Sequence, residues 1–162
     1  MKIQLSAITD ALDMIWEEWS IYLNRETGEI INLPNEAFAL AEENESEEEI
    51  DEALTHAEIV EDENDITIAQ DILNHPERYA CLPDQYDINE YEIMRDFSQS
   101  YEDEHICGEL CDAITGRGAF RFFKSTIARL GIRDEYFAFK EKAYKKIARE
   151  WCEVNKIEYY ED

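Results

Sequence analysis

The sequence predicts an α+β fold, in which a small antiparallel β-sheet, an N-terminal hairpin plus a short strand, precedes a mainly helical C-terminal part. Two runs of β-branched and aromatic residues flank a glycine-containing turn near the N-terminus. From Ile88 onward, apolar residues recur every three or four positions, as expected of helices with one buried face. The chain of 162 residues holds only 5 Gly and 3 Pro, which favours long regular elements over a loop-rich scaffold.

The N-terminal part carries the signals for strands. Apolar side chains at near-helical spacing first predict a short helix over residues 6–16. The runs WSIYLN (19–24) and EIINL (29–33) then flank a turn that ends in Gly28, a pattern typical of a β-hairpin. Residues 79–83 predict a further short strand, which a proline ends.

The segment from Glu42 to Asp65, here called the acidic tract, holds 13 acidic and no basic residues in 24 positions. Ile50 and Leu54 keep a helical spacing inside it, so part of the tract is predicted to be a helix with one thin apolar stripe. The run of charges over 61–65 is predicted to be a loop.

The C-terminal part is predicted to be helical from Ile88 to the end of the chain. Apolar residues at spacings of three and four continue to Leu130. A last helix is expected to begin near Asp134, with aromatic side chains on one side and lysines mostly on the other. We expect one domain over residues 1–162.

Charge is distributed very unevenly along the chain. It has 40 Asp and Glu against 15 Lys and Arg, a formal net charge of −25. Residues 1–105 carry 30 acidic and 4 basic side chains, a net charge of −26, whereas residues 106–162 form a near-neutral part with 10 acidic and 11 basic side chains. So acidic a protein repels phosphates, which argues against direct nucleic-acid binding and against anionic membrane surfaces.

The absence of targeting segments and of catalytic motifs guides the expected compartment and chemistry. The N-terminal segment has no apolar run of the length of a signal peptide or membrane span, which predicts a cytoplasmic protein. Reduced core thiols are the favoured interpretation of Cys81, Cys107, Cys111 and Cys152, and the Cys107 and Cys111 spacing is only a weak zinc signal. We expect no metal site, no cofactor and no catalytic residue, because no nucleophile, calcium-loop or nucleotide motif occurs.

Two interpretations of the acidic tract remain open. A run of like charges is commonly a solvated face that keeps a protein soluble. Ordered carboxylates can instead imitate nucleic-acid phosphates, which would make the chain a non-catalytic inhibitor of a basic nucleic-acid-binding protein, such as a CRISPR or restriction effector. The residues expected to meet such a partner are Glu43, Glu47, Glu48, Asp51, Glu52, Glu61, Asp62, Glu63 and Asp65.

A second candidate site is basic. Arg117, Arg121 and Lys124 follow one another at intervals of four and three, which predicts one cationic stripe on a helix that begins after Gly116 and Gly118. Such a helix start could hold a small anionic ligand or RNA, with the acidic part serving solubility. The competing interpretation is a helix–helix turn whose cations pair with the chain's own carboxylates.

Three stretches of the chain resemble a widespread bacterial family of uncharacterised proteins. They are Tyr-Leu-Asn (22–24) with Thr-Gly-Glu (27–29), Gly-Arg-Gly-Ala-Phe (116–120) and the closing Glu-Trp-Cys-Glu (150–153). The resemblance covers nearly the whole chain except the acidic tract, and its most specific part is the Gly-Arg-Gly-Ala-Phe run. It implies a cytosolic domain of bacterial or phage type and brings no established activity.

Overall fold

The computed structural model describes residues 1–162 and confirms the α+β class. Eight α-helices accompany a three-stranded antiparallel sheet and a two-stranded parallel pair. The chain divides into two compact units, which we call the sheet unit (residues 1–85 and 148–162) and the helical unit (residues 86–147). The change in charge after residue 105 therefore falls inside the helical unit. The expectation of one domain stays a prediction.

The sheet of the sheet unit grows from the predicted hairpin. Strand β2 (Trp19–Asn24) pairs antiparallel with both β3 (Ile30–Pro34) and β4 (Tyr79–Cys81), which gives the order β3-β2-β4. At the end of the hairpin turn, Gly28 has a φ of 77°, a left-handed conformation that glycine adopts without a Cβ clash. The predicted hairpin and short strand are confirmed.

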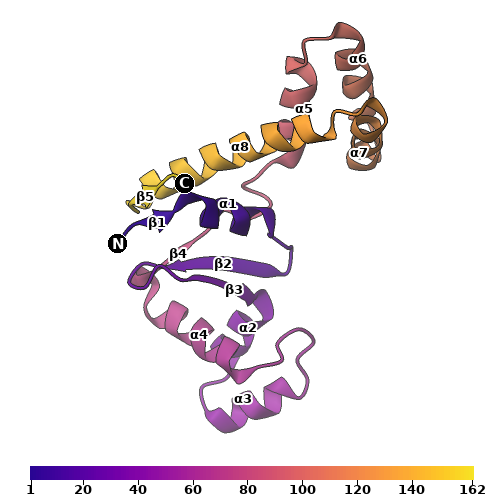
Figure 1. Ribbon diagram of the computed structural model, residues 1–162. Coiled ribbons are helices and arrows are strands. Elements are labelled where there is room, and N and C mark those ends of the chain that lie inside the picture. Colours follow the sequence, from indigo (N-terminus) through magenta and orange to yellow (C-terminus); the bar gives the residue numbers. More distant parts are fainter. The chain divides into compact units, whose positions relative to one another are not determined.

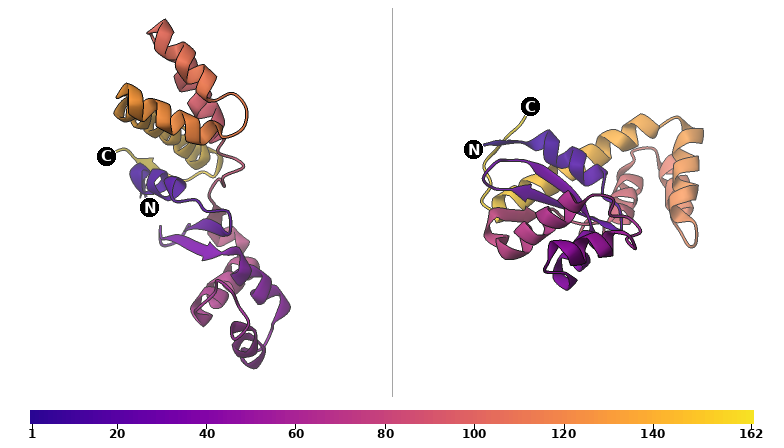
Figure 2. Two further views of the ribbon diagram at one scale, coloured as in Figure 1. Left: turned by 90° about the vertical axis from the view of Figure 1, so that its right-hand side faces the viewer. Right: turned by 90° about the horizontal axis from the view of Figure 1, so that it is seen from below.

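Side-chain alternation along β2 gives the sheet two packed faces. Ile21 and Leu23 are buried on one face, and Tyr22 lies on the other, directly opposite Ile31 of β3. The ring of Tyr22 packs on that of Phe38, with centroids 5.5 Å apart. Figures 1 and 2 show helices from residues 1–85 beyond both sides of the sheet. These are α1 (Leu5–Asp13) on one side, and α2 (Asn35–Glu43), α3 (Glu47–Leu54) and α4 (Glu63–Asn74) on the other.

The two ends of the sheet unit form a short parallel pair that local patterning did not predict. Strand β1 (Ile3–Gln4) pairs with β5 (Tyr159–Tyr160). Elsewhere in the unit, the 3-10 turn η1 (Pro76–Arg78) leads into β4. The prediction of helix to the C-terminus is therefore wrong for the last residues. Helix α8 (Arg133–Val154) ends where Lys156 takes a φ of 58° and the Ile157 N–H donates to the Cys152 carbonyl at 2.8 Å.

The helical unit is built as the apolar spacing predicts. It contains α5 (Glu90–Ser100), α6 (Glu104–Ala113), α7 (Ala119–Leu130) and residues 133–147 of α8. Phe97, Phe123 and Tyr136 meet in its core, with ring centroids 4.8 to 6.2 Å apart and steep interplanar angles. Helix α8 begins one residue before the predicted Asp134, and none of the helices is both long and apolar enough to cross a lipid bilayer.

Candidate functional site

The acidic tract lies on ordered helices. Helices α2, α3 and α4 pack around one apolar cluster on the Tyr22 side of the sheet. Its buried members are Leu33, Ala37, Ile50, Val60, Ile66, Ala69 and Ile72. Within the tract, Ile50 and Val60 contribute buried side chains to this core, and most of the acidic side chains around them lie on the outer surface.

A capping box fixes the start of α3. The Ser46 hydroxyl accepts a hydrogen bond from the Glu49 N–H at 3.3 Å, while the Glu49 carboxylate accepts from the Ser46 N–H at 3.2 Å. The Glu45 N–H also donates to Glu49, at 3.0 Å. The Glu45 and Ser46 N–H groups hold the pKa of Glu49 below its ordinary value. Glu49 is therefore a structural carboxylate that orders α3.

Glu36 fixes the segment that follows α3. Its carboxylate, in the first turn of α2, accepts hydrogen bonds from the backbone N–H groups of Glu58, Ile59 and Val60 at 2.9, 2.7 and 2.9 Å. These donors, with Glu58 the largest cause, hold the pKa of Glu36 below its ordinary value. A side chain outside the tract thus anchors the non-helical part of the tract to α2.

The start of α4 corrects the predicted loop over 61–65. Helix α4 begins at Glu63, and Asp62 is its N-cap, accepting a hydrogen bond from the Asn64 N–H at 2.9 Å. Asp65 is half-buried, and burial together with the charge of Asp62 raises its pKa. The error arose because acidic residues are common both in loops and in the first turn of a helix, where they face the positive end of its dipole.

The structure brings most of the predicted partner-binding residues to the surface. Seven of the nine are exposed and their side chains accept no hydrogen bond, whereas Asp62, also exposed, caps α4 and Asp65 is half-buried. No ion pair involves any carboxylate between residues 42 and 65. The exposed seven are Glu43, Glu47, Glu48, Asp51, Glu52, Glu61 and Glu63. The surface that α3 and its neighbours present is therefore acidic and not neutralised.

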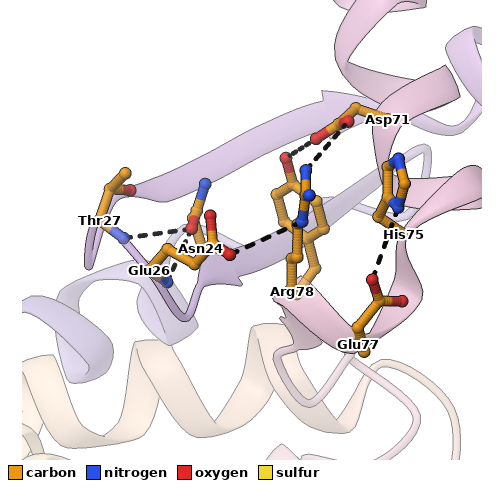
Figure 3. Close-up of polar contacts among 8 residues, drawn as sticks. Asn24, Glu26, Thr27, Asp71, His75, Glu77 and Arg78 are labelled. Atoms are coloured by element: carbon orange, nitrogen blue, oxygen red, sulfur yellow. Dashed lines mark hydrogen bonds and ion pairs between the residues drawn. The ribbon is translucent and has the colours of Figure 1, made fainter.

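Two arginines of the sheet unit make their contacts outside the acidic tract. Figure 3 shows Arg78 between two acidic groups, with Nε 3.6 Å from the Glu26 carboxylate and Nη1 3.9 Å from that of Asp71. The Tyr79 hydroxyl donates to Asp71, and this contact raises the pKa of Tyr79 to about 12. Arg25 donates to the Asn155 carbonyl at 2.8 Å. Arg25 and Arg78 therefore stabilise the hairpin end of the unit and leave the tract's charge intact.

A protein-family model matches residues 33–162, which is most of the chain. The chain belongs to the uncharacterised protein family UPF0158. The UPF0158 match confirms membership of an uncharacterised family. The match includes the acidic tract, which the resemblance did not cover. It begins at residue 33, after the hairpin turn. Comparison with curated proteins and with solved structures found no match.

The predicted basic stripe is only partly formed. Helix α7 begins at Ala119, so Arg117 lies in the preceding turn and does not share a helix face with Arg121 and Lys124. The reason is Gly118, which takes a φ of 74° and ends the turn in a left-handed conformation. All three cations are exposed, and within the helical unit none forms an ion pair. The helix–helix turn of the competing interpretation is confirmed. Ion pairs between these three cations and carboxylates of the helical unit are not found.

The four cysteines occupy three different environments. Cys152 is buried, and burial raises the pKa of its thiol to about 11. Cys107 and Cys111 are half-buried on α6, Cys81 is exposed, and no pair forms a disulfide. The expectation of core cysteines holds fully for Cys152 alone. No group of three or more His, Cys, Asp or Glu side chains has the geometry to hold a metal ion.

Proposed function

We propose that the chain is a non-catalytic interaction protein whose acidic helical surface docks onto the cationic groove of a nucleic-acid-binding protein. The observation that carries this proposal is the combination of order and unneutralised charge in α2 to α4. A mobile acidic tail would lose conformational entropy on binding. Here hydrogen bonds from the backbone to Glu36 and Glu49 already hold the tract in place.

Charge spacing supports mimicry of nucleic acid. Duplex DNA carries one negative charge per about 1.7 Å along its axis. Successive residues of an α-helix rise by about 1.5 Å, and α3 offers Glu47, Glu48, Asp51 and Glu52 as exposed carboxylates within two turns. Lysine and arginine side chains arranged to hold phosphates would find acceptors at a comparable density.

The mechanism is competition for a shared surface. The net charge of −25 attracts a basic partner at long range, which accelerates encounter, and direct contacts between carboxylates and cations then exclude the nucleic acid. Such binding weakens as salt rises, because ions screen exposed charges over about 8 to 10 Å. A cytoplasmic nuclease, such as a CRISPR or restriction effector, is the class of partner that fits this chemistry. The chain would then act as an anti-CRISPR or anti-restriction inhibitor.

Two charge-reversal variants test the proposal. The first replaces Glu48, Asp51, Glu52 and Glu61 by Lys, four exposed tract carboxylates without hydrogen-bond partners. The control replaces Asp10, Glu102, Asp112 and Glu153 by Lys, which are also exposed and change the net charge equally. Each immobilised chain is exposed to a lysate of the native host at low salt, and bound proteins are identified by mass spectrometry.

We expect the unmodified chain and the control variant to retain the same nucleic-acid-binding protein, which the tract variant loses and which high salt releases. Circular dichroism establishes that all three chains are folded. Equal retention by the folded tract variant would contradict the proposal, and so would loss of the partner from both variants, since overall charge alone would then explain binding.

A second function is favoured by the exposure of the basic residues in the helical unit. Arg117, Arg121 and Lys124 are free of ion pairs within that unit and accessible to RNA or a small anion. Titration with RNA distinguishes the two functions. Binding that disappears when Arg117 and Arg121 are replaced by Ala supports this second function, whereas the mimicry proposal predicts no dependence on these residues.

A further inference from the structure

A cavity of about 340 Å³ lies between α7 and α8 within the helical unit. Arg133, Tyr136, Phe137 and Lys140 line it from α8 at spacings of three, one and three, which places them on one helix face. Lys124, Ile127 and Ala128 line it from α7, and Glu90, the first residue of α5, completes the wall. Its volume is that of a small-molecule site.

The cavity gathers cations in a chain that has few of them. Lys124 and Arg133 both line it, and neither forms an ion pair, although the chain holds 40 carboxylates against 15 Lys and Arg. The Arg133 guanidinium lies 5.2 Å from the centre of the Phe137 ring. Lys140 is 3.5 Å from Glu90, so only one of the three cations has a neutralising carboxylate. The wall of the cavity is therefore net cationic.

Tyr136 supplies an unsatisfied hydrogen-bond donor at the same place. Its side chain lines the cavity, only 2 % of the residue is exposed, and its hydroxyl is buried without a hydrogen-bond partner. A buried polar group without a partner costs about 1 to 3 kcal/mol, so native proteins rarely retain one without a reason. Burial and the nearby charge of Glu90 raise the pKa of Tyr136, which keeps the hydroxyl protonated and able to donate.

We propose that this cavity binds a phosphate group, either as the free ion or as a monoester. The group would accept the Tyr136 hydrogen bond and lie among the charges of Lys124, Arg133 and Lys140. It would give the Tyr136 hydroxyl an acceptor and give Lys124 and Arg133 an anionic partner. The apolar parts of Ile127, Ala128 and Phe137 leave room for the organic part of a small ester. The cavity shares Lys124 with the predicted basic stripe, but neither Arg117 nor Arg121 lines it.

The proposal does not depend on the acidic surface, which belongs to the other unit. The experiment is isothermal titration calorimetry of the full chain with three probes: inorganic phosphate, adenosine monophosphate and adenosine. We expect both phosphates to bind and adenosine not to bind. Tighter binding of the monophosphate identifies an ester as the ligand, whereas equal binding of the two identifies the free ion. Absence of phosphate binding at concentrations on the order of 10 mM overturns the proposal, as does equal binding of adenosine.

Variants then test the residues. Tyr136→Phe removes only the hydroxyl. Because the lost hydrogen bond has a charged acceptor, phosphate binding should weaken by about tenfold. Lys124→Met should weaken it similarly, while Arg121→Ala, an exposed residue of α7 outside the cavity, should leave it unchanged. Thermal unfolding without ligand verifies that each variant is folded. Unchanged affinity in both folded cavity variants, or an equal loss in Arg121→Ala, would contradict the assigned site.

Discussion

Replacement of Glu36 by Ala tests whether one carboxylate holds the acidic surface in place. Three backbone N–H groups, those of Glu58, Ile59 and Val60, donate to this side chain. A hydrogen bond contributes about 0.5 to 1.5 kcal/mol net, and because the Glu36 carboxylate is partly exposed to solvent, the lower part of that range applies. We therefore expect the free energy of unfolding to fall by about 2 kcal/mol.

Urea unfolding followed by circular dichroism measures this change. Glu42→Ala is the matched control, because Glu42 lies exposed on the same helix and accepts no structural hydrogen bond. It should change the free energy of unfolding by less than about 0.5 kcal/mol. Hydrogen exchange should accelerate at the amides of residues 58–60 in Glu36→Ala only. A loss no larger than that of the control would refute the assigned role of Glu36.

The pH dependence of the same variant has a defined sign. The pKa of Glu36 is lowered in the folded chain, so its stabilising contribution is present above the unfolded-state pKa and is lost as the pH falls through the folded-state pKa. The difference in unfolding free energy between the unmodified chain and Glu36→Ala should therefore be largest near pH 7. It should shrink as the pH falls below the ordinary glutamate pKa of about 4.3, because the unfolded chain and then Glu36 in the folded chain become protonated. A difference that stays constant down to pH 3 would show that the hydrogen bonds do not require the carboxylate's charge.

Three other substitutions or reactions test local features of the fold. Ser46→Ala removes the capping box of α3 and should lower the free energy of unfolding in urea by about 1 kcal/mol; no change would mean that α3 does not need its cap. Lys156→Gly relieves a left-handed conformation at the end of α8 and should raise the free energy of unfolding by about 0.5 to 1 kcal/mol, whereas destabilisation would contradict the observed φ. Iodoacetamide at pH 8 should modify Cys152 last of the four cysteines, because this thiol is buried and its pKa is raised to about 11. Peptide mass spectrometry measures the order of modification, and early modification of Cys152 would argue that this part of the sheet unit opens readily.

The sequence predicted the elements whose signals are local. The hairpin over 19–34 has strand-forming runs on both sides of a glycine turn, and both strands formed where the pattern placed them. The helices from Ile88 to Leu130 have regular apolar stripes, which need no knowledge of distant residues. The basic stripe was predicted incorrectly at Arg117, because the left-handed Gly118 ends a turn there and the helix begins only after it.

Elements that depend on distant partners were missed. Strands β1 and β5 contain two residues each and pair across almost the full length of the chain, so neither has a periodic signal. Helix α2 begins without a side-chain cap and runs into the acidic tract, which obscured its short apolar stripe. The hydrogen bonds to Glu36 could not be predicted either, because their donors lie 22 to 24 residues away in the sequence.

The candidate sites show the same division. The acidic character of the tract is evident from composition, but which carboxylates are structural depends on hydrogen bonds that only the fold reveals, as for Glu49 and Asp62. The cavity of the helical unit combines side chains from three helices, so the sequence offered Lys124 as a candidate without its partners Arg133 and Tyr136.

Displacement of DNA from the partner tests whether the acidic surface competes with nucleic acid. The nucleic-acid-binding protein recovered by the unmodified chain is bound to fluorescent duplex DNA, and the chain is added while fluorescence anisotropy is recorded at several salt concentrations. We expect the unmodified chain and the control variant to release the DNA, more effectively at low salt. The variant with Lys at positions 48, 51, 52 and 61 should not release it. A complex in which the partner holds the chain and the DNA together would contradict this competition.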